Sequence, residues 1–232
     1  MANHHILDQQ GQDISANDTW HALAHEQLPD GVALAELNLG EILHKQEKLD
    51  IILPIQDLLT ALNVNSPLLQ EVLALVNQHS SRLATWLSTD TTLEQLDELA
   101  EVLDIDDSLA EEVDADGDKS KAKAKPKKRK KDAPPTIDPE SLHKIELVVI
   151  YVPAFADGRG FSLAKHLRQI GYQGEIRMAG AFGRDQIAYL RRSGVDSFVI
   201  AEQDMSDDIA QSFNDLASAY AGTQVSKLPM FR

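Results

Sequence analysis

The second half of the chain alternates short apolar runs with amphipathic segments. Residues 145–152 are β-branched and almost continuously apolar, which is typical of a strand covered on both faces. Apolar positions then recur at helical spacing from Leu163 to Ile170, and Gly171 marks the end of that helix. The further segments expected by the same criteria are a strand at 175–179, a helix at 185–193, a strand at 195–200 and a helix at 206–220. Strands alternating with helices predict a parallel sheet with right-handed crossovers.

The first half carries a weaker form of this pattern. Residues 82–88 are predicted to be a strand and 92–103 its helix, which would supply the first strand–helix unit of the sheet. Before it, apolar positions recur at helical spacing in 51–62 and 68–76, which indicates helices that pack onto the sheet. We therefore predict an α/β protein with a small parallel sheet, layered as in Rossmann-like or flavodoxin-like folds, and with helical N-terminal additions.

Charge divides the chain further. The net charge is −15, yet nine of the 22 basic residues lie between Lys119 and Lys131, directly after an acidic stretch that runs from Asp90 to Asp118. Residues 104–143 cannot bury enough apolar surface to offset the entropy cost of ordering, so we predict a disordered linker there. The expected organisation is a mostly helical region 1–81, a strand–helix unit 82–103, the linker 104–143 and an α/β core domain 144–232.

A second reading of the basic stretch is a tether for nucleic acid or another acidic partner, because nine cations could displace condensed counterions. The stretch has no aromatic side chain for base stacking, and the acidic flank competes for its charges. We therefore favour a solvated linker and expect no nucleic-acid partner.

The composition excludes several classes of site. The chain has no cysteine, so it offers no disulfide, no cysteine nucleophile and no protein-held iron–sulfur cluster. The N-terminal residues lack the plan of a signal peptide, and the longest apolar run, 147–152, is too short to cross a bilayer. We expect a cytoplasmic protein without a membrane association.

One loop combines glycines with charged side chains. Asp157-Gly158-Arg159-Gly160-Phe161-Ser162 follows the strand 145–152, and Ser162 is predicted to cap the next helix. Glycines let a backbone approach a ligand, and the start of a helix favours an anion. Leu163 stands where a dinucleotide fingerprint needs glycine, and the loop lacks the Gly-Lys-Ser/Thr ending of a P-loop.

A second glycine-bearing loop, residues 180–186, lies at the next strand–helix junction. Since the carboxyl ends of parallel strands share one edge, we expect Arg159 and Arg184 to come from neighbouring loops there and to bind an oxyanion or a partner protein. The candidate residues for this anion or partner site are Asp157, Gly158, Arg159, Gly160, Ser162, Arg184, Asp185, Gln186, Arg191 and Arg192.

Alternatives to a binding site remain at these positions. Asp157 can simply pair with Arg159 or Arg184, and Arg191-Arg192 can form a solvated helix face. Asp157 and Asp185 could act as acid and base, but the sequence identifies no catalytic residue. His21 and His25 have the spacing of metal ligands without a third ligand, and His4-His5 lies at the chain terminus, so we expect neither a metal nor a cofactor.

Two motifs resemble a known family. Residues 153–162 fit the pattern P-x-F-x-D-G-R-G-[YF]-S, and residues 184–198 fit R-D-Q-x-x-x-[LM]-x-R-x-G-[FV]-D-x-F. Both patterns are typical of the bacterial domain-of-unknown-function family 934. The resemblance is strong over about 90 residues and extends weakly to 82–99, to Trp20 and to residues 28–31, whereas 50–80 and 104–143 look like insertions.

The resemblance implies a role in assimilatory sulfite reduction, because members of this family are usually encoded beside sulfite reductase. Siroheme sulfite reductase needs cysteine-held iron and sulfur, which this chain cannot supply. The expectation is therefore an accessory protein that docks to sulfite reductase or binds an oxyanion. The alternatives are a stand-alone enzyme acting on a phosphorylated or sulfated small molecule, and binding of nucleic acid or an acidic partner through the basic stretch.

Overall fold

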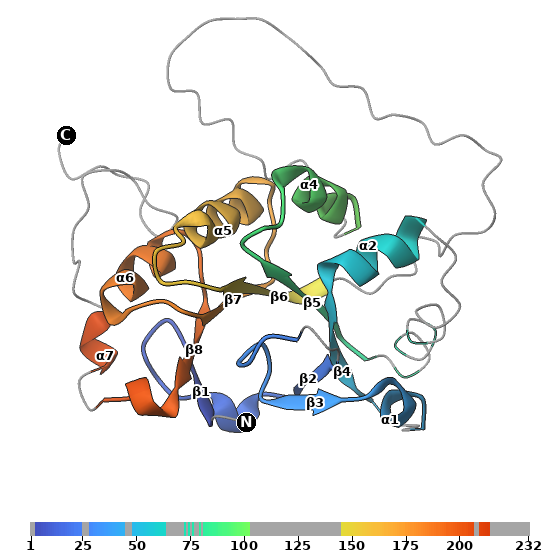
Figure 1. Ribbon diagram of the computed structural model, residues 1–232, viewed down its shortest axis with the longest axis horizontal. Helices are drawn as coiled ribbons and strands as arrows, with labels where there is room; N and C mark the ends of the chain where they lie inside the picture. The colour runs from blue at the N-terminus through green and yellow to red at the C-terminus, as the bar shows by residue number, and fades with distance from the viewer. Residues whose placement is uncertain are drawn as a thin grey trace, which may run out of the picture.

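In the computed structural model one curled sheet runs through the molecule (Figure 1). The structure describes residues 3–24, 28–44, 48–63, 72, 74, 76, 79, 81–102, 145–206 and 209–213. The predicted linker 104–143 lies outside these residues. The strands are β1 His4–Leu7, β2 Trp20–Leu23, β3 Ala35–Leu37, β4 Asp50–Pro54, β5 Leu83–Ser88, β6 Ile145–Val152, β7 Glu175–Gly180 and β8 Ser197–Ala201.

The sheet is mostly parallel. Its strand order is β1-β8-β7-β6-β5-β4-β2-β3, and within it only β1 runs antiparallel to its neighbour, β8. The described helices are α1 Leu39–His44, α2 Ile55–Asn63, α4 Leu93–Val102, α5 Arg159–Gln169, α6 Arg184–Arg192 and α7 Ile209–Ser212, with short 3₁₀ turns η1 Ser15–Asn17 and η4 Glu202–Asp204.

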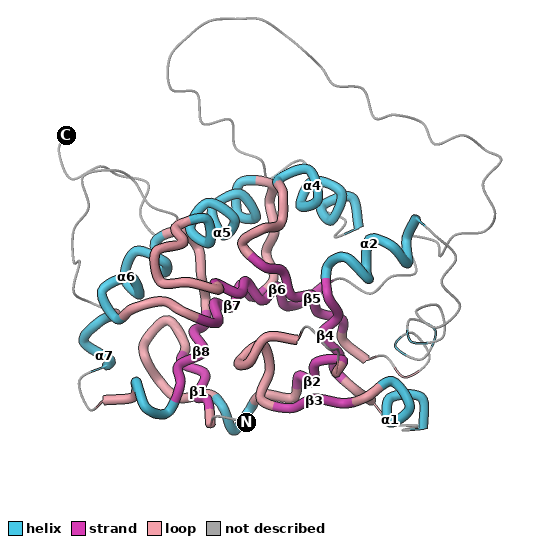
Figure 2. Tube along the Cα trace, viewed as in Figure 1, coloured by secondary structure: helices cyan, strands magenta, loops and turns pink. Residues whose placement is uncertain are grey.

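The winding of the sheet corrects the predicted layering. From β4 to β8 each strand lies beside the one before it in the chain, so the crossovers always advance in the same direction. Right-handed crossovers of this kind put every helix on one face, as in (β/α) barrels. Helices α2, α4, α5, α6 and α7 indeed line the outer side of the curl (Figures 1 and 2). The predicted α/β class is confirmed, but the prediction of a small sheet with Rossmann-like or flavodoxin-like layering was wrong.

The N-terminal region also differs from the expectation. Strands β1 to β4 all lie between residues 4 and 54 and belong to the same sheet as the later strands. The apolar stretch 51–62, predicted as one helix, divides at Pro54 into the buried strand β4 and the helix α2. Strand β5 and helix α4 lie where the first strand–helix unit was predicted. However, β5 is a central strand of the sheet, between β6 and β4, and not the strand at which the sheet begins.

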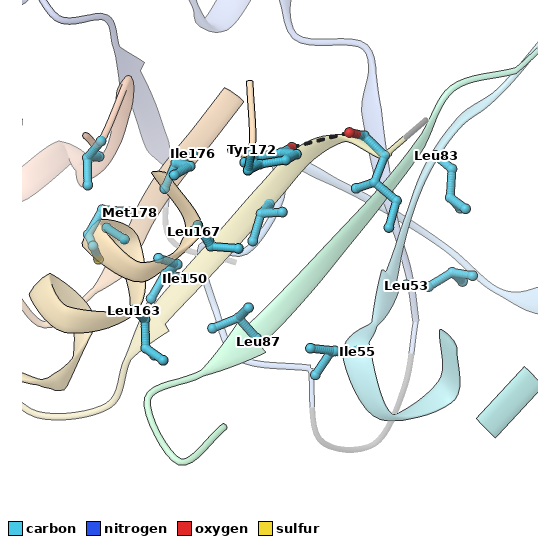
Figure 3. Packing of buried hydrophobic residues seen from close by; sticks show 14 of the residues in the cluster. Leu53, Ile55, Leu83, Leu87, Ile150, Leu163, Leu167, Tyr172, Ile176 and Met178 are labelled. Carbon is cyan, nitrogen blue, oxygen red and sulfur yellow. Dashed lines mark hydrogen bonds between the residues drawn. The ribbon is translucent and has the colours of Figure 1, made fainter. Parts of the chain in front are cut away.

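Two apolar cores cover the two faces of the sheet. Between the sheet and the helices, Leu163 and Leu167 of α5 pack with Ile150, Leu87 and Ile176 of the strands (Figure 3). Inside the curl, Ile6, Trp20, Trp86, Val149 and Val199 form the second core, which N-terminal loop residues such as Val32 close. The continuous apolarity of β6 follows from this burial on both faces.

The amino ends of the strands carry buried ion pairs. Arg177 of β7 reaches across the inside of the curl to Asp18, 3.0 Å away, and both side chains are 3% exposed. Burial raises the pKa of Asp18, and the attraction of Arg177 opposes this effect. Contacts of this kind tie the loop before β2 to the sheet, so we assign this end of the molecule to stability.

Candidate functional site

The carboxyl ends of the parallel strands form the edge at which the candidate residues gather. Strands β4 to β8 are parallel neighbours, so the loops that follow them lie side by side at one edge. Ligands of parallel α/β sheets and barrels bind at this edge because loop side chains and helix starts converge there.

The loop after β6 is built around Asp157. The Arg159 guanidinium donates to both carboxylate oxygens of Asp157, at 2.9 and 2.8 Å, and Thr89 donates to the second oxygen at 2.5 Å. The hydrogen bonds from Arg159 and then Thr89 lower the pKa of Asp157 well below its usual range. The remaining guanidinium nitrogen of Arg159 lies 2.8 Å from Asp90. All three nitrogens of Arg159 are thus engaged by carboxylates, which is the pairing that the sequence left as an alternative.

Helix α5 begins earlier than predicted. Its first residue is Arg159, so Ser162 is exposed within the helix and does not cap it. The reason is that Asp157 accepts a hydrogen bond from the backbone N–H of Arg159 at 3.1 Å and satisfies the helix start itself. Gly160 has a packing role, because a Cβ there would lie 3.2 Å from the Val152 side chain.

The loop after β7 touches the loop after β6. Gln186 accepts a hydrogen bond from the Gly183 backbone at 3.3 Å and donates to the Phe155 carbonyl at 3.4 Å. A Cβ on Gly183 would lie 2.6 Å from the Phe155 ring and 2.5 Å from a carboxylate oxygen of Asp185. A side chain at 183 would therefore displace the Phe155 ring and the Asp185 carboxylate, both of which are exposed.

A hollow of about 220 Å³ opens beside the second loop. Its walls come from the end of β7, the start of α6, strand β8 with η4, and the turn around Asp30. The lining residues are His4, Asp30, Gly180, Phe182, Gly183, Arg184, Ile187, Val199, Ile200, Ala201, Asp204 and Ile209.

Of the candidate arginines, Arg184 lines the hollow. Its guanidinium donates to the hydroxyls of Ser212 and Ser206, each at 3.2 Å. These contacts lie on the β8 side, whereas Arg159 turns to Asp90 on the β5 side. The structure thus brings the two loops together. The two guanidinium groups, however, bind partners on opposite sides, Arg184 toward β8 and Arg159 toward β5. A site shared by both arginines stays a prediction.

The other candidates lie around helix α6. Asp185 is exposed in the first turn, where a carboxylate suits the helix dipole. Arg191 and Arg192 belong to the last turn, at the opposite end of the helix from the hollow, and Arg191 donates to the Phe213 carbonyl at 2.8 Å. Neither arginine lines the hollow.

Three titratable residues of the hollow, His4, Asp30 and Asp204, were not among the candidates for the anion or partner site. His4 lies in β1, which pairs with β8 so that His4 is opposite Ala201, at the edge where the parallel strands end. Its imidazole lies 4.0 Å from the carboxylate of Asp30, and Asp204 closes η4 on the same side. Only the antiparallel pairing places His4 here; a four-residue strand at a chain end has too little periodicity to predict it.

Neither a metal cluster nor a membrane span is present in the part of the chain that the structure describes. No three His, Asp or Glu side chains within it come close enough to hold an ion together. None of the helices within it combines the length and the apolar run needed to cross a bilayer. His25, one of the pair considered as metal ligands, lies outside the described residues.

The comparisons with known proteins agree with the two motifs. Residues 128–231 match a family described as bacterial protein of unknown function (DUF934). No curated protein and no solved structure shows significant similarity to the chain. The matched residues contain β6 to α7 and both loops of the candidate edge. The C-terminal part of this chain, residues 128–231, therefore resembles the DUF934 family, as its two motifs predicted.

Proposed function

We propose that this protein is an accessory protein of assimilatory sulfite reduction and that it binds a sulfur oxyanion in the hollow beside Arg184. The resemblance to the family implies the pathway, and the hollow supplies a place for the ligand. The single observation that carries the proposal is that Arg184 and the start of helix α6 line one cavity at the carboxyl edge of the sheet.

This combination suits an oxyanion for two physical reasons. A guanidinium is planar and always charged, and it can donate two parallel hydrogen bonds to a tetrahedral anion. The first turn of a helix carries backbone N–H groups without intrahelical partners and the positive end of the helix dipole. Gly180 and Gly183 line the same hollow, beside the start of this helix.

An accessory role fits the composition better than the reduction itself. Six-electron reduction of sulfite by the siroheme enzyme relies on iron and sulfur held by cysteine, and this chain has no cysteine. Binding and delivery of the anion, or docking to the reductase through the same edge, needs no redox group.

Calorimetric titration with sulfite and sulfate tests the binding. We expect the wild type to bind at least one of these anions, and Arg184→Gln to lose about tenfold or more in affinity, because one charge-assisted contact contributes about 1.5–3 kcal/mol. Arg192→Gln is the matched control, since it removes the same charge from the far end of the same helix. Equal affinity in Arg184→Gln and the wild type would exclude the hollow as the anion site.

Growth of a deletion strain tests the pathway separately. We expect slow growth with sulfate as the sulfur source and normal growth with cysteine, and we expect tagged protein to retain sulfite reductase in a pull-down. Wild-type growth on sulfate together with no recovered reductase would contradict the proposed role, whatever the calorimetry shows.

A further inference from the structure

We infer that the hollow beside Arg184 selects an amphoteric ligand, namely a small sulfonate or phosphate that also carries an ammonium group. This inference rests on the proposed function, because it takes the anionic end of the ligand to Arg184. The inference goes beyond the proposed function because it assigns a second subsite, formed by Asp30 and Asp204, to the ammonium group of the ligand.

The charges around the hollow carry the inference. One guanidinium, that of Arg184, faces a wall that also contains the carboxylates of Asp30 and Asp204. His4 adds a positive charge only when its ring is protonated. Among the lining residues that the structure describes, one cationic and two anionic side chains give a formal charge of −1 while the imidazole is neutral.

A bare divalent anion is therefore matched by Arg184 but not by the acidic side of this lining. Arg184 attracts it, and the two carboxylates repel it at the distances found across a cavity of this size. A molecule that carries an ammonium group beside its oxyanion replaces that repulsion with a second attraction. Recognition of this kind selects by charge on both sides of a pocket, so it favours the amphoteric ligand over an inorganic anion, which gains only the contact with Arg184.

The acidic side of the hollow is held in place by packing. Asp30 precedes Gly31, which has φ +86° and would bring a Cβ within 3.1 Å of the His4 ring. The turn thus lies against His4, and strand pairing fixes His4 opposite Ala201 at the end of β8. Asp204 follows β8 directly through the 3₁₀ turn η4. Both carboxylates consequently border the same hollow as Arg184, although they come from distant parts of the sequence.

The size of the hollow also favours more than an inorganic anion. The hollow has a volume of about 220 Å³, well above the minimum of about 10–15 Å³ that a cavity needs to hold one water molecule. Sulfate or sulfite would fill only part of this space. A short aliphatic chain that joins a sulfonate to an ammonium group fills it better, whereas drug-sized ligands need larger pockets of at least about 300 Å³.

Taurine and propane-1-sulfonate provide a matched pair of probes, because they have nearly the same shape and differ in an ammonium group against a methyl group. We expect calorimetry to give taurine about fivefold higher affinity than propane-1-sulfonate for the wild-type protein, which corresponds to about 1 kcal/mol from one partly exposed ion pair. Arg184→Gln should weaken both ligands.

Asp204→Asn gives the decisive readout because we expect it to affect the affinities for taurine and for propane-1-sulfonate differently. The substitution should weaken taurine about fivefold and should leave propane-1-sulfonate unchanged or bound more tightly, since a repelling charge is removed. A merely structural role of Asp204 would weaken both ligands alike. Glu202→Gln is the control, because Glu202 is exposed in the same 3₁₀ turn but does not line the hollow.

The outcomes separate this inference from the proposed function. Equal affinity for taurine and propane-1-sulfonate, with binding of both lost in Arg184→Gln, would overturn the amphoteric ligand and leave the oxyanion site intact. Loss of both ligands to the same extent in Asp204→Asn would also overturn it. No detectable binding of taurine, propane-1-sulfonate, sulfite or sulfate would remove the oxyanion site together with the inference.

Discussion

At the scale of single residues, Asp50 is a carboxylate whose charge the fold clearly stabilises. Its side chain is 7% exposed and accepts hydrogen bonds from Arg82 at 2.5 Å and Thr19 at 2.6 Å. Arg82 in turn lies over the Trp20 ring, 4.7 Å from its centre. Burial by itself would favour the protonated acid, but these hydrogen bonds outweigh it and lower the pKa of Asp50 from 3.8 to about 2.

This pKa predicts a specific dependence of stability on pH. A lowered pKa in the folded state stabilises the protein above pH 3.8, and the contribution, about 2 kcal/mol, disappears as the pH falls through about 2. Urea unfolding should therefore show Asp50→Asn to be less stable than the wild type at pH 7, with a difference that shrinks toward pH 2.

A control for this prediction is Asp90→Asn. Asp90 is 76% exposed and pairs with the exposed Arg159, so its removal should cost less than about 1 kcal/mol at pH 7. A difference between wild type and Asp50→Asn that stays constant from pH 7 to pH 2 would contradict the assignment.

At the scale of elements, the junction between β7 and α6 depends on one glycine. Gly180 has φ +95°, and a Cβ there would lie 2.3 Å from the carbonyl oxygen of Val152 on the neighbouring strand. Both the backbone conformation and the close approach exclude a side chain. The turn that delivers Gly183 and Arg184 to the hollow therefore starts from a position that only glycine can occupy.

We expect Gly180→Ala to destabilise the protein by about 3 kcal/mol, from the left-handed backbone and the collision with the adjacent strand. Gly158→Ala should change the unfolding free energy by less than about 1 kcal/mol, because Gly158 has φ −78° and nothing lies within 4 Å of a Cβ there. Chemical denaturation of both variants measures the contrast. Similar stabilities of the two variants would show that the strand end tolerates a side chain.

At the scale of the whole molecule, the family-like part of the chain completes its sheet with strands from outside it. Strand β6 pairs with β5, and β8 pairs with β1, so both edges of the β6–β8 unit are covered by residues before 103. Inside the curl, Val149 and Val199 share their core with Ile6 and Trp86. Each core thus contains residues both from before 103 and from after 144.

We therefore expect residues 128–232, expressed alone, to lack a cooperative thermal transition, because the fragment exposes two unpaired strand edges and part of both cores. Calorimetry of the fragment and of the full chain makes the comparison. Mixing or co-expressing the fragment with residues 1–103 should restore the transition. A sharp transition of the isolated fragment would show that the family-like part is a domain by itself.

The sequence alone determined those features that depend on local patterns. The β-branched run at 145–152 and the strand and helix at 82–103 were predictable because burial on two faces and amphipathic spacing leave clear periodicities. Both family motifs and the alternative pairing of Asp157 with Arg159 are also readable from neighbouring residues.

Only the tertiary structure decided two features of the fold, namely the direction in which the sheet is wound and the pairing of strands that are distant in the sequence. Neither a doubly wound nor a singly wound sheet leaves a signature in the order of strands and helices, because both arise from the same right-handed units. The pairing of β1 with β8 joins residues at opposite ends of the described chain. It sets His4 beside Arg184, and the turn that carries Asp30 packs against His4. A strand of four residues is too short for its sequence to specify which strand it pairs with. The composition of the hollow therefore follows from the pairing of β1 with β8 rather than from any one segment of the sequence.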